Sequence, residues 1–470
     1  MKAGPETAEP GTQVTPPDVS LLEVIGPEVI EREVAETGSR LSRLRSDPVM
    51  LNTIAIMAST VVTSVLGYVF WIIVARSLGS ETSGTGAAIT SALQATVLVA
   101  AVGAAAAMIE WLPRSTTTLQ WRQRVTAGLI VTVVAATLGG LLVPALLGFS
   151  FGVLPQLGTA TGAGLFCLAS VFFALGILID YIAISERRGG VLLLRNVILT
   201  GLRIPLLFVP LAALGGDNKI LAAWTIAACA SLVVAVATFR RNSGGRTLRP
   251  AFGEVRAHLK EMAASLLGQH LITVAAMMAG YLLPILVVAR LSPSDNAYFY
   301  VTWMLGSVFF IISPAVSTAL FAAGAADPSA LGALARRSVL ISAALLVLPM
   351  LVYLFGGGLL LDLFGDGYAS RGRLLLILLT LSAIPDAITN IAVSVLRATN
   401  RLGEALHLNA GMLALCIVGS WFLLPYWGIL AAGIWWLVAQ SAGAIWVVLS
   451  WHRIGRIPPN DQIPAESLPA

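Results

Sequence analysis

The sequence predicts an all-α integral membrane protein in which the second half repeats the first. Charged residues make up only 11% and hydrophobic residues 57% of its 470 residues, and the mean hydropathy is +0.86, whereas charged residues form about a quarter of a typical soluble domain. Identical residues also recur at a single constant offset in the numbering: Gly67-Tyr68 with Gly280-Tyr281, and Arg188, Gly190, Asn196 and Arg240 with Arg401, Gly403, Asn409 and Arg453. This shared offset indicates two copies of one helical unit.

Apolar runs of roughly 20 residues, the length that crosses about 30 Å of hydrocarbon as a helix, recur through almost the whole chain. They exclude a transmembrane β-barrel, because barrel strands alternate polar and apolar side chains. The runs predict about twelve membrane-spanning helices, at approximately residues 50–75, 84–110, 124–147, 159–183, 191–212, 219–239, 262–289, 295–322, 336–355, 373–395, 404–424 and 429–451.

Basic residues crowd alternate connections between these runs. By the positive-inside rule the side with the crowded basic residues is cytoplasmic, so both termini are expected in the cytoplasm. The expected location is the plasma membrane, which the chain crosses many times. Each repeat holds six spans, an even number, so both copies enter the membrane in the same direction and are related by a pseudo-twofold axis along its normal. The crowded connections contain Arg114, Arg122, Arg124, Arg187, Arg188, Arg240, Arg241, Arg246, Arg249, Arg256, Lys260, Arg336, Arg337, Arg397, Arg401, Arg453 and Arg456.

The same pattern divides the chain into five parts. Residues 1–47 are too polar to span and are expected to form a disordered cytoplasmic tail with one interfacial helix. Two six-helix bundles, 48–239 and 262–452, are joined by a basic linker, 240–261, whose Gly and Pro steps predict a flexible tether. A second cytoplasmic tail covers 453–470.

Several functional classes are disfavoured. The three cysteines, Cys167, Cys229 and Cys416, lie in apolar spans without a CxxC pair or a clustered histidine, so neither a disulfide framework nor a metal site is predicted, and no cofactor is expected. The net charge of +5 is explained by membrane orientation and gives no reason to expect a nucleic-acid partner. The longest outward connection, 356–370, has no histidine or cysteine, and this favours transport over an enzyme acting at the membrane surface.

The first span carries a recognisable pattern. Asn52, Gly67-Tyr68-Val69-Phe70-Trp71 and Ala75-Arg76-Ser77-Leu78-Gly79 resemble the opening of the polysaccharide transporter branch of the MOP flippase superfamily, the Wzx-like O-antigen and exopolysaccharide flippases. Val288-Ala289-Arg290-Leu291 repeats part of this pattern at the seventh span. The resemblance covers roughly residues 48–455 in topology, while motif similarity is confined to the first two spans and to residues 187–196 and 397–409. Pro284 stands at the repeat position of Trp71, and the acidic tail is outside the shared core.

The resemblance implies two bundles that face each other across a central cavity. It also implies alternating access that carries a polyprenyl-pyrophosphate-linked oligosaccharide from the cytoplasmic to the outer leaflet. The partners it implies are the lipid-linked glycan, membrane lipids, and the glycan polymerase and glycosyltransferases of the same pathway.

A pyrophosphate in transit needs positive charge inside the membrane, because an unpaired anion there is costly. Arg203 is the leading candidate, since it lies near the middle of the fifth span, too deep to reach the headgroups easily; the alternative is an arginine paired to fix helix packing. Arg195, one turn inside the cytoplasmic edge, is expected to extend to the headgroups. Arg76 and Arg290 close the first and seventh spans and are candidates for either a paired outer gate or simple anchors in lipid phosphate.

Two neutral polar residues are further candidates for substrate contact. His270 lies in the inner third of the seventh span and has an ordinary pKa of about 6.5, which suits either sugar binding or proton coupling; hydrogen-bonded packing is the alternative. Gln94 is a mid-span amide of the second span, suited to lining a sugar-compatible cavity or to bonding between helices.

Three carboxylates lie nearest to membrane depth. Asp386, after Pro385 in the tenth span, is the deepest and is a candidate for proton or sodium coupling. Glu110 and Asp180 lie close to the cytoplasmic ends of the second and fourth spans, where water is expected to leave them ordinary. A cation-coupled multidrug exporter of the MATE type is therefore the alternative function, and a membrane glycan polymerase is a weaker one.

Overall fold

The computed structural model describes residues 48–209, 218–241, 248–326 and 331–454, and the two tails predicted for 1–47 and 453–470 lie outside these ranges except for residues 453 and 454. The described residues form helices joined by short connections. In chain order these are α2 (Pro48–Trp111), α3 (Thr118–Val143), the π-helix η1 (Pro144–Ser150), the 3₁₀ turn η2 (Pro155–Gly158), α4 (Ala160–Ser185), α5 (Gly189–Leu206), α6 (Lys219–Arg241), α7 (Val255–Arg290), α8 (Pro293–Gly306), α9 (Phe309–Ala326), α10 (Leu331–Asp362), α11 (Tyr368–Ala398), α12 (Leu402–Trp427) and α13 (Leu430–Ile454).

Hydroxyl side chains fix where several helices begin. Thr117, Thr159 and Ser292 precede α3, α4 and α8 in extended conformations, and each accepts a hydrogen bond from the amide three residues later. The N-terminal amides of a helix have no partner within it, so a Ser or Thr at this position removes one unpaired donor.

The first two predicted spans correspond to α2, which is two helices joined by a kink at Gly79. Its 64 residues would extend about 96 Å at 1.5 Å per residue, about three times the hydrocarbon thickness. Gly79 has φ 74° and ψ 166°, and the positive φ is accessible because glycine has no Cβ. The 11 helices of the described chain that are long and apolar enough to span a membrane thus provide twelve crossings, since the first contains two.

The two halves repeat one another in local geometry. Arg187 and Asn400, which the sequence repeat aligns with each other, both have a positive φ, 56° and 57°. The amide of the following residue, Arg188 or Arg401, donates to the carbonyl five residues earlier at 2.7 or 2.8 Å. The sequence repeat therefore corresponds to a structural repeat, and we refer to α2–α6 as the N-lobe and to α7–α13 as the C-lobe.

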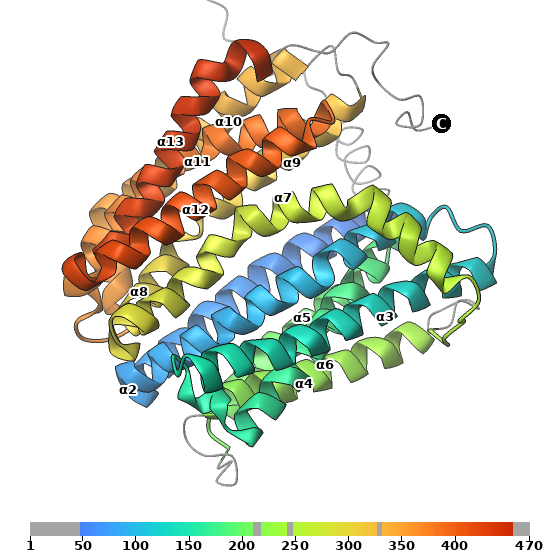
Figure 1. Ribbon diagram of the computed structural model, residues 1–470, viewed down its shortest axis with the longest axis horizontal. Coiled ribbons are helices and arrows are strands. Elements are labelled where there is room, and N and C mark those ends of the chain that lie inside the picture. The colour runs from blue at the N-terminus through green and yellow to red at the C-terminus, as the bar shows by residue number, and fades with distance from the viewer. Residues whose placement is uncertain (1–47, 210–217, 242–247, 327–330, 455–470) are drawn as a thin grey trace, which may run out of the picture.

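The lobes join at one end of the molecule. We call the end that contains Gly79, Pro293 and Phe364 the charge-poor end, and the opposite end, with Arg188 and Arg401, the basic end. In Figure 1 the ribbons of α2 and α8 meet at the charge-poor end, whereas α3–α6 and α9–α13 diverge from there. One apolar cluster spans both lobes at this junction and includes Phe70, Trp71, Val74, Val301, Leu305, Leu361 and Phe364.

Gly84 allows the backbones of α2 and α8 to approach each other closely. A Cβ on Gly84 would overlap the backbone oxygen of Pro293, and the carbonyl of Gly84 accepts a 2.7 Å hydrogen bond from the fully buried side chain of Asn296. The hydroxyls of Ser80 and Ser294 lie 3.2 Å apart beside this contact. The backbones of α2 and α8 therefore touch directly.

The connection between the lobes is anchored along its described part. Arg122 of α3 donates to the carbonyls of residues 249 and 250 at 2.9 and 3.1 Å, and Thr126 accepts from the amide of Ala251 at 2.9 Å. Leu248, Val255 and Leu259 pack against the N-lobe core. The flexible tether predicted for 240–261 is thus held against α3 over residues 248–254, while 242–247 lie outside the described residues.

The junction predicts a specific cross-link. In a chain whose native cysteines are replaced by alanine, Ser80→Cys with Ser294→Cys should form a disulfide under mild oxidation, because their side-chain oxygens are already in contact. Adding Gly84→Ala should reduce the cross-linked fraction, measured by gel shift, by more than half. The single-cysteine variants are the controls, and an unchanged yield with Gly84→Ala would show that the close backbone contact is not required.

Candidate functional site

Arg203 lies inside the N-lobe without an acidic partner among the described residues. It is 9% exposed, and its Nε has no hydrogen-bond partner in the described chain. Its guanidinium lies 3.8 Å from the ring centroid of Trp224 on α6 and 5.2 Å from that of Phe173 on α4. Two aromatic faces therefore stabilise a buried cation that no carboxylate of the described chain neutralises.

Tyr300 of the C-lobe lies within electrostatic range of this cation. Its side chain also lies near those of Thr90 and Gln94 on α2 and of Tyr281 on α7. We call these five residues, Thr90, Gln94, Arg203, Tyr281 and Tyr300, the junction cluster. It combines groups of both lobes around one buried positive charge.

The start of α8 positions Tyr300. Asn296, bonded to Gly84, and Tyr300 are four residues apart on one helix and so lie on the same face. The ring of Tyr300 also packs on Trp71 with centroids 4.6 Å apart, and Trp71 is 5% exposed. Tyr300 is thus fixed by the contact that joins the two lobes.

Arg76 and Arg290 occupy different surroundings. Arg76 crosses between the lobes and donates to the carbonyl of Leu363 at 2.9 Å. Arg290 stays within the C-lobe, where it stacks on Trp421 at 4.6 Å and donates to the carbonyl of the same residue at 3.2 Å. The repeat therefore does not place them as a symmetrical pair, although Arg76 does contact both lobes.

His270 forms a contact between α7 and α2. Its Nε2 lies 3.1 Å from the carbonyl oxygen of Val99, and its ring lies against Gly103, where an added Cβ would be 3.2 Å from Cγ. Because a carbonyl only accepts, Nε2 carries the hydrogen. This is the arrangement that the packing interpretation of His270 expects.

Asp386 forms a second polar site, within the C-lobe. It is 5% exposed, its neighbours are Ser313 of α9 and Asn390 of α11, and its Oδ2 has no hydrogen-bond partner in the described chain. One turn along α11, Thr389 donates to the Gln440 side chain of α13 at 3.2 Å. A buried carboxylate among hydroxyls and amides has the ligand chemistry of a proton or a small cation site.

Asp180 and Arg195 differ from their predicted surroundings. Arg195 does not extend to the headgroups: it is 4% exposed and forms a two-pronged ion pair with Asp180, whose Oδ1 lies 2.6 Å from Nε. Asp180 is likewise buried rather than hydrated, because the pair lies between α4 and α5 with Asn196 as a third member. Glu110, in contrast, forms a 2.9 Å surface ion pair with Arg114.

The two lobes differ in their partly unpartnered buried charges. The repeat places Cys416 at the position of Arg203, and Phe173 at the position of Asp386. Cys416 is fully buried in the C-lobe core, and Phe173 is one of the rings beneath Arg203. The N-lobe cation and the C-lobe anion therefore lie on helices that the repeat does not relate, and each has an uncharged counterpart.

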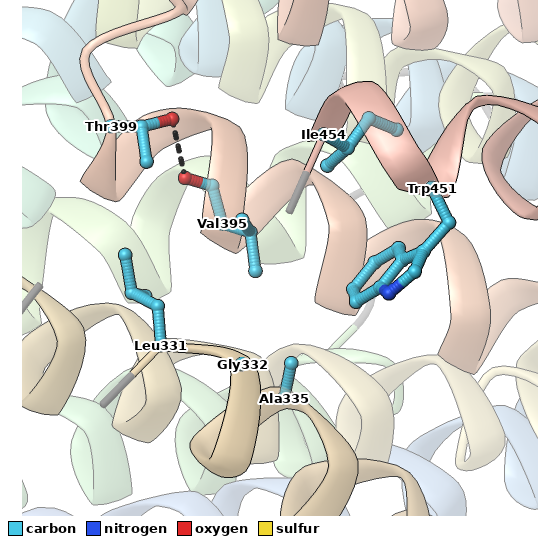
Figure 2. Close-up of a pocket in the computed structure, with 7 residues that line it drawn as sticks. All are labelled: Leu331, Gly332, Ala335, Val395, Thr399, Trp451 and Ile454. Carbon is cyan, nitrogen blue, oxygen red and sulfur yellow. Dashed lines mark hydrogen bonds between the residues drawn. The ribbon is translucent and has the colours of Figure 1, made fainter. Parts of the chain in front are cut away.

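A small cavity at the basic end offers little chemistry. It lies between α10, α11 and α13, has a volume of about 10 Å³ and is lined by Leu331, Gly332, Ala335, Val395, Thr399, Trp451 and Ile454. Figure 2 shows the hydroxyl of Thr399 directed to the carbonyl of Val395, at 2.9 Å. The space is too small and too apolar for a transported solute. Within the described ranges no group of three metal-ligating side chains gathers.

The sequence predicted Arg203 and Gln94 as candidates, and both lie near Tyr300, but it did not predict the residues around them. Tyr300 lies in the other lobe from Gln94, and Trp224 lies on the next helix after Arg203. Only Tyr281 had a signal, because it belongs to the repeated Gly-Tyr pair.

No family model and no curated protein matches the sequence, but solved structures match its fold. A multidrug resistance MATE family transporter of the MOP superfamily, in an inward-facing conformation, gives a TM-score of 0.66 at 14% identity over 85% of this chain and 98% of that one. The lipid II flippase MurJ, in an inward closed conformation, gives 0.68 at 12% identity over 85% and 87%. A MOP superfamily transporter from Pyrococcus furiosus gives 0.60 at 15% identity over 88% and 98%. The chain is a multi-pass membrane protein that shares the two-lobed helical fold of these transporters, and the predicted fold class is confirmed.

The buried ion pair gives a stability prediction that uses the repeat. Arg195→Leu should lower the free energy of unfolding by about 3–5 kcal/mol, because it leaves Asp180 charged and buried. The C-lobe has Val393 and Leu408 at the two equivalent positions. The double variant Asp180→Val with Arg195→Leu should therefore recover most of the loss, as measured by thermal unfolding of the detergent-purified protein.

Arg114→Leu is the matched control, since an exposed pair contributes at most about 1 kcal/mol. A double variant as unstable as Arg195→Leu would show that the ion pair itself, rather than the removal of an unpaired charge, stabilises the N-lobe.

Proposed function

We propose that this protein is a flippase that moves a polyprenyl-pyrophosphate-linked oligosaccharide from the cytoplasmic to the outer leaflet by alternating access. The observation that carries the proposal is Arg203, a buried cation at the lobe junction with no carboxylate partner in the described chain. A cation stabilised only by aromatic rings keeps its N–H donors available for an anion. A pyrophosphate supplies that anion.

The lobe arrangement supports the direction of transport. The lobes meet at the charge-poor end, which the positive-inside rule assigns to the outer face. A junction closed at that end leaves entry from the cytoplasmic side, where lipid-linked precursors are made. The resemblance of the fold to the lipid II flippase MurJ supports a lipid-linked substrate.

The remainder of the junction cluster suits a glycan. Gln94, Tyr281 and Tyr300 present an amide and two hydroxyls, and the ring of Trp71 lies beside them. Sugars bind through such neutral donors and acceptors and through aromatic faces. We also propose that both termini are cytoplasmic. The proposed partners are the glycan polymerase and the glycosyltransferases of the same pathway.

A cation-coupled exporter of the MATE type is the second candidate, and Asp386 is the observation that favours it. Its partly unpartnered carboxylate lies in the C-lobe, and multidrug MATE transporters share the fold. The two proposals differ in substrate charge. Arg203 disfavours a cationic drug at the junction, whereas Asp386 can drive either kind of transporter by binding a cation.

Loss of the Arg203 charge should strongly reduce glycan export. Arg203→Gln, expressed in a deletion strain, should lower surface glycan about ten- to a hundredfold and leave lipid-linked glycan on the cytoplasmic leaflet, since hydrogen bonds to charged groups contribute about 1.5–3 kcal/mol each. The measurements are surface glycan staining and mass spectrometry of lipid intermediates.

Arg188→Gln is the matched control, because Arg188 also stacks on an aromatic ring, that of Phe239 at 4.6 Å, but lies at the basic end. It should retain export. Unchanged glycan and unchanged lipid intermediates in the deletion strain would overturn the flippase proposal, and sensitivity of that strain to cationic drugs would favour the exporter.

Asp386 is expected to couple transport to a cation rather than to bind the glycan. Asp386→Asn keeps the shape and removes the charge, so it should make glycan export independent of the proton or sodium gradient and lower its rate about tenfold or more, since export then lacks the differential cation binding that favours one state. Export assayed in vesicles with imposed gradients measures this. A variant that keeps the wild-type gradient dependence would exclude Asp386 as the coupling residue.

A further inference from the structure

An open hollow of about 600 Å³ lies between α10 and α11 at the charge-poor end, and small-molecule sites have volumes of about 300–1,000 Å³. Four lining residues of each helix follow the spacing i, i+3, i+4 and i+7, which brings them onto one face of that helix. On α10 these are Phe355, Gly358, Leu359 and Asp362, and on α11 they are Ser370, Arg373, Leu374 and Ile377. Two helices of one lobe thus form a continuous wall around a single space.

The hollow faces outward from the C-lobe. Phe355 and Leu359 are 82% and 75% exposed. On another face of the same two helices, Leu361 and Leu376 are fully buried in the apolar cluster that joins the lobes. The hollow is therefore outside the lobe junction, and in a membrane its apolar wall is in contact with lipid chains.

Two glycines of α10 shape this space differently. A Cβ on Gly357 would lie 2.9 Å from Cδ2 of Leu376, so Gly357 allows α10 and α11 to approach each other. A Cβ on Gly358 would come within 4 Å of no atom beyond the adjacent backbone of its own helix. Since glycine destabilises a helix relative to alanine and packing does not require it here, Gly358 is the residue that leaves the hollow unfilled.

One acidic and one basic side chain lie on the rim of the hollow. Asp362 is the last residue of α10, and Arg373 is in the second turn of α11. Neither side chain forms a hydrogen bond or an ion pair with another residue in the described part of the chain, whereas the nearby Arg371 pairs with Asp295 at 3.5 Å. Both rim charges are therefore available to a ligand that carries one charge of each sign.

We infer that the hollow binds one molecule of phosphatidylethanolamine, with its phosphate on Arg373, its ammonium on Asp362 and an acyl chain along Phe355, Leu359 and Leu374. The ends of α10 and α11 place the two charges at the level of lipid headgroups, and the apolar side chains lie one to two turns deeper. This inference is independent of the transported substrate, because the hollow is separate from the junction cluster.

The chemistry of the rim selects this headgroup among common phospholipids. A primary ammonium has N–H donors for a carboxylate, whereas the quaternary ammonium of phosphatidylcholine has none. The headgroup of phosphatidylglycerol offers Asp362 no cation and leaves its own negative charge beside the carboxylate. The oxygen of Ser370, whose hydrogen is donated to the carbonyl of Gly367 at 3.1 Å, is a further acceptor at the rim for the ammonium.

Lipid binding to the purified full chain tests the identity of the occupant. Detergent-solubilised protein is titrated with phosphatidylethanolamine, phosphatidylcholine, phosphatidylglycerol or a polyprenyl phosphate, and native mass spectrometry gives the dissociation constant of the tightest-bound molecule. The wild type should bind phosphatidylethanolamine about three- to tenfold more tightly than phosphatidylcholine, the range of one hydrogen bond. Asp362→Asn should remove this preference and leave phosphatidylcholine binding unchanged. Asp366→Asn, which changes an exposed acid outside the hollow, should keep the preference.

Filling the hollow tests the location of the lipid. Gly358→Leu should weaken binding of phosphatidylethanolamine about tenfold, because the new side chain occupies the hollow without meeting the protein. Gly356→Leu is the matched control, since a Cβ there also meets open space but lies outside the hollow; it should bind like the wild type. Thermal unfolding without added lipid should be the same for both variants, which shows that neither disturbs the fold.

Three results would overturn the inference. Wild-type binding by Gly358→Leu would show that the lipid lies elsewhere. An unchanged preference in Asp362→Asn would show that the carboxylate does not hold the ammonium. Tighter binding of phosphatidylglycerol or of the polyprenyl phosphate by the wild type would replace phosphatidylethanolamine with an anionic lipid as the occupant.

Discussion

The contact of Gly84 with the first turn of α8 is the constraint on which the other features depend. A backbone oxygen occupies the space that a side chain at this position would need, so the two helices approach more closely than ridges of side chains allow. Asn296 completes the contact with a fully buried hydrogen bond. The apolar cluster around Phe70 and Leu305 packs at the same junction, and three members of the junction cluster, Thr90, Gln94 and Tyr300, lie on these two helices.

The two lobes share their backbone geometry but differ in several buried charged residues. Turns at Arg187 and Asn400 have nearly the same φ, 56° and 57°, yet several buried charges of one lobe have uncharged equivalents in the other. Asp180 and Arg195 are matched by valine and leucine, and Arg203 by a buried cysteine. Because burying a charge is costly unless it is paired or used, the unpaired Arg203 and Asp386 are the positions where packing within the described chain does not account for the residue.

Hydropathy and the constant offset of the repeat were enough to predict the twelve crossings and the two parallel units, because span length and periodicity are local properties of the chain. The direction in which a side chain points is not local. Distance from the membrane edge predicted that Arg195 reaches the headgroups, but its partner lies 15 residues earlier on another helix. His270 meets a backbone carbonyl, which has no residue signature, and Tyr300 meets Gln94 across the lobe boundary. The position of Arg203 within its apolar span correctly predicted that the side chain is buried. Its neighbours could be identified only from the three-dimensional structure.

The position of Gly84 along α2 determines how far each part of this helix moves when it rotates about the contact with α8. The helix continues from residue 84 to residue 111, about 40 Å at 1.5 Å per residue, while Gln94 is only about 15 Å from that pivot. A rotation of about ten degrees at Gly84 would displace the far end of α2 by about 7 Å, comparable to the width of a sugar ring, but would displace Gln94 by less than about 3 Å. Because α2 is rigid from Gly84 onward, a rotation that opens the basic end widely moves the polar side chain of Gln94 by a much smaller distance.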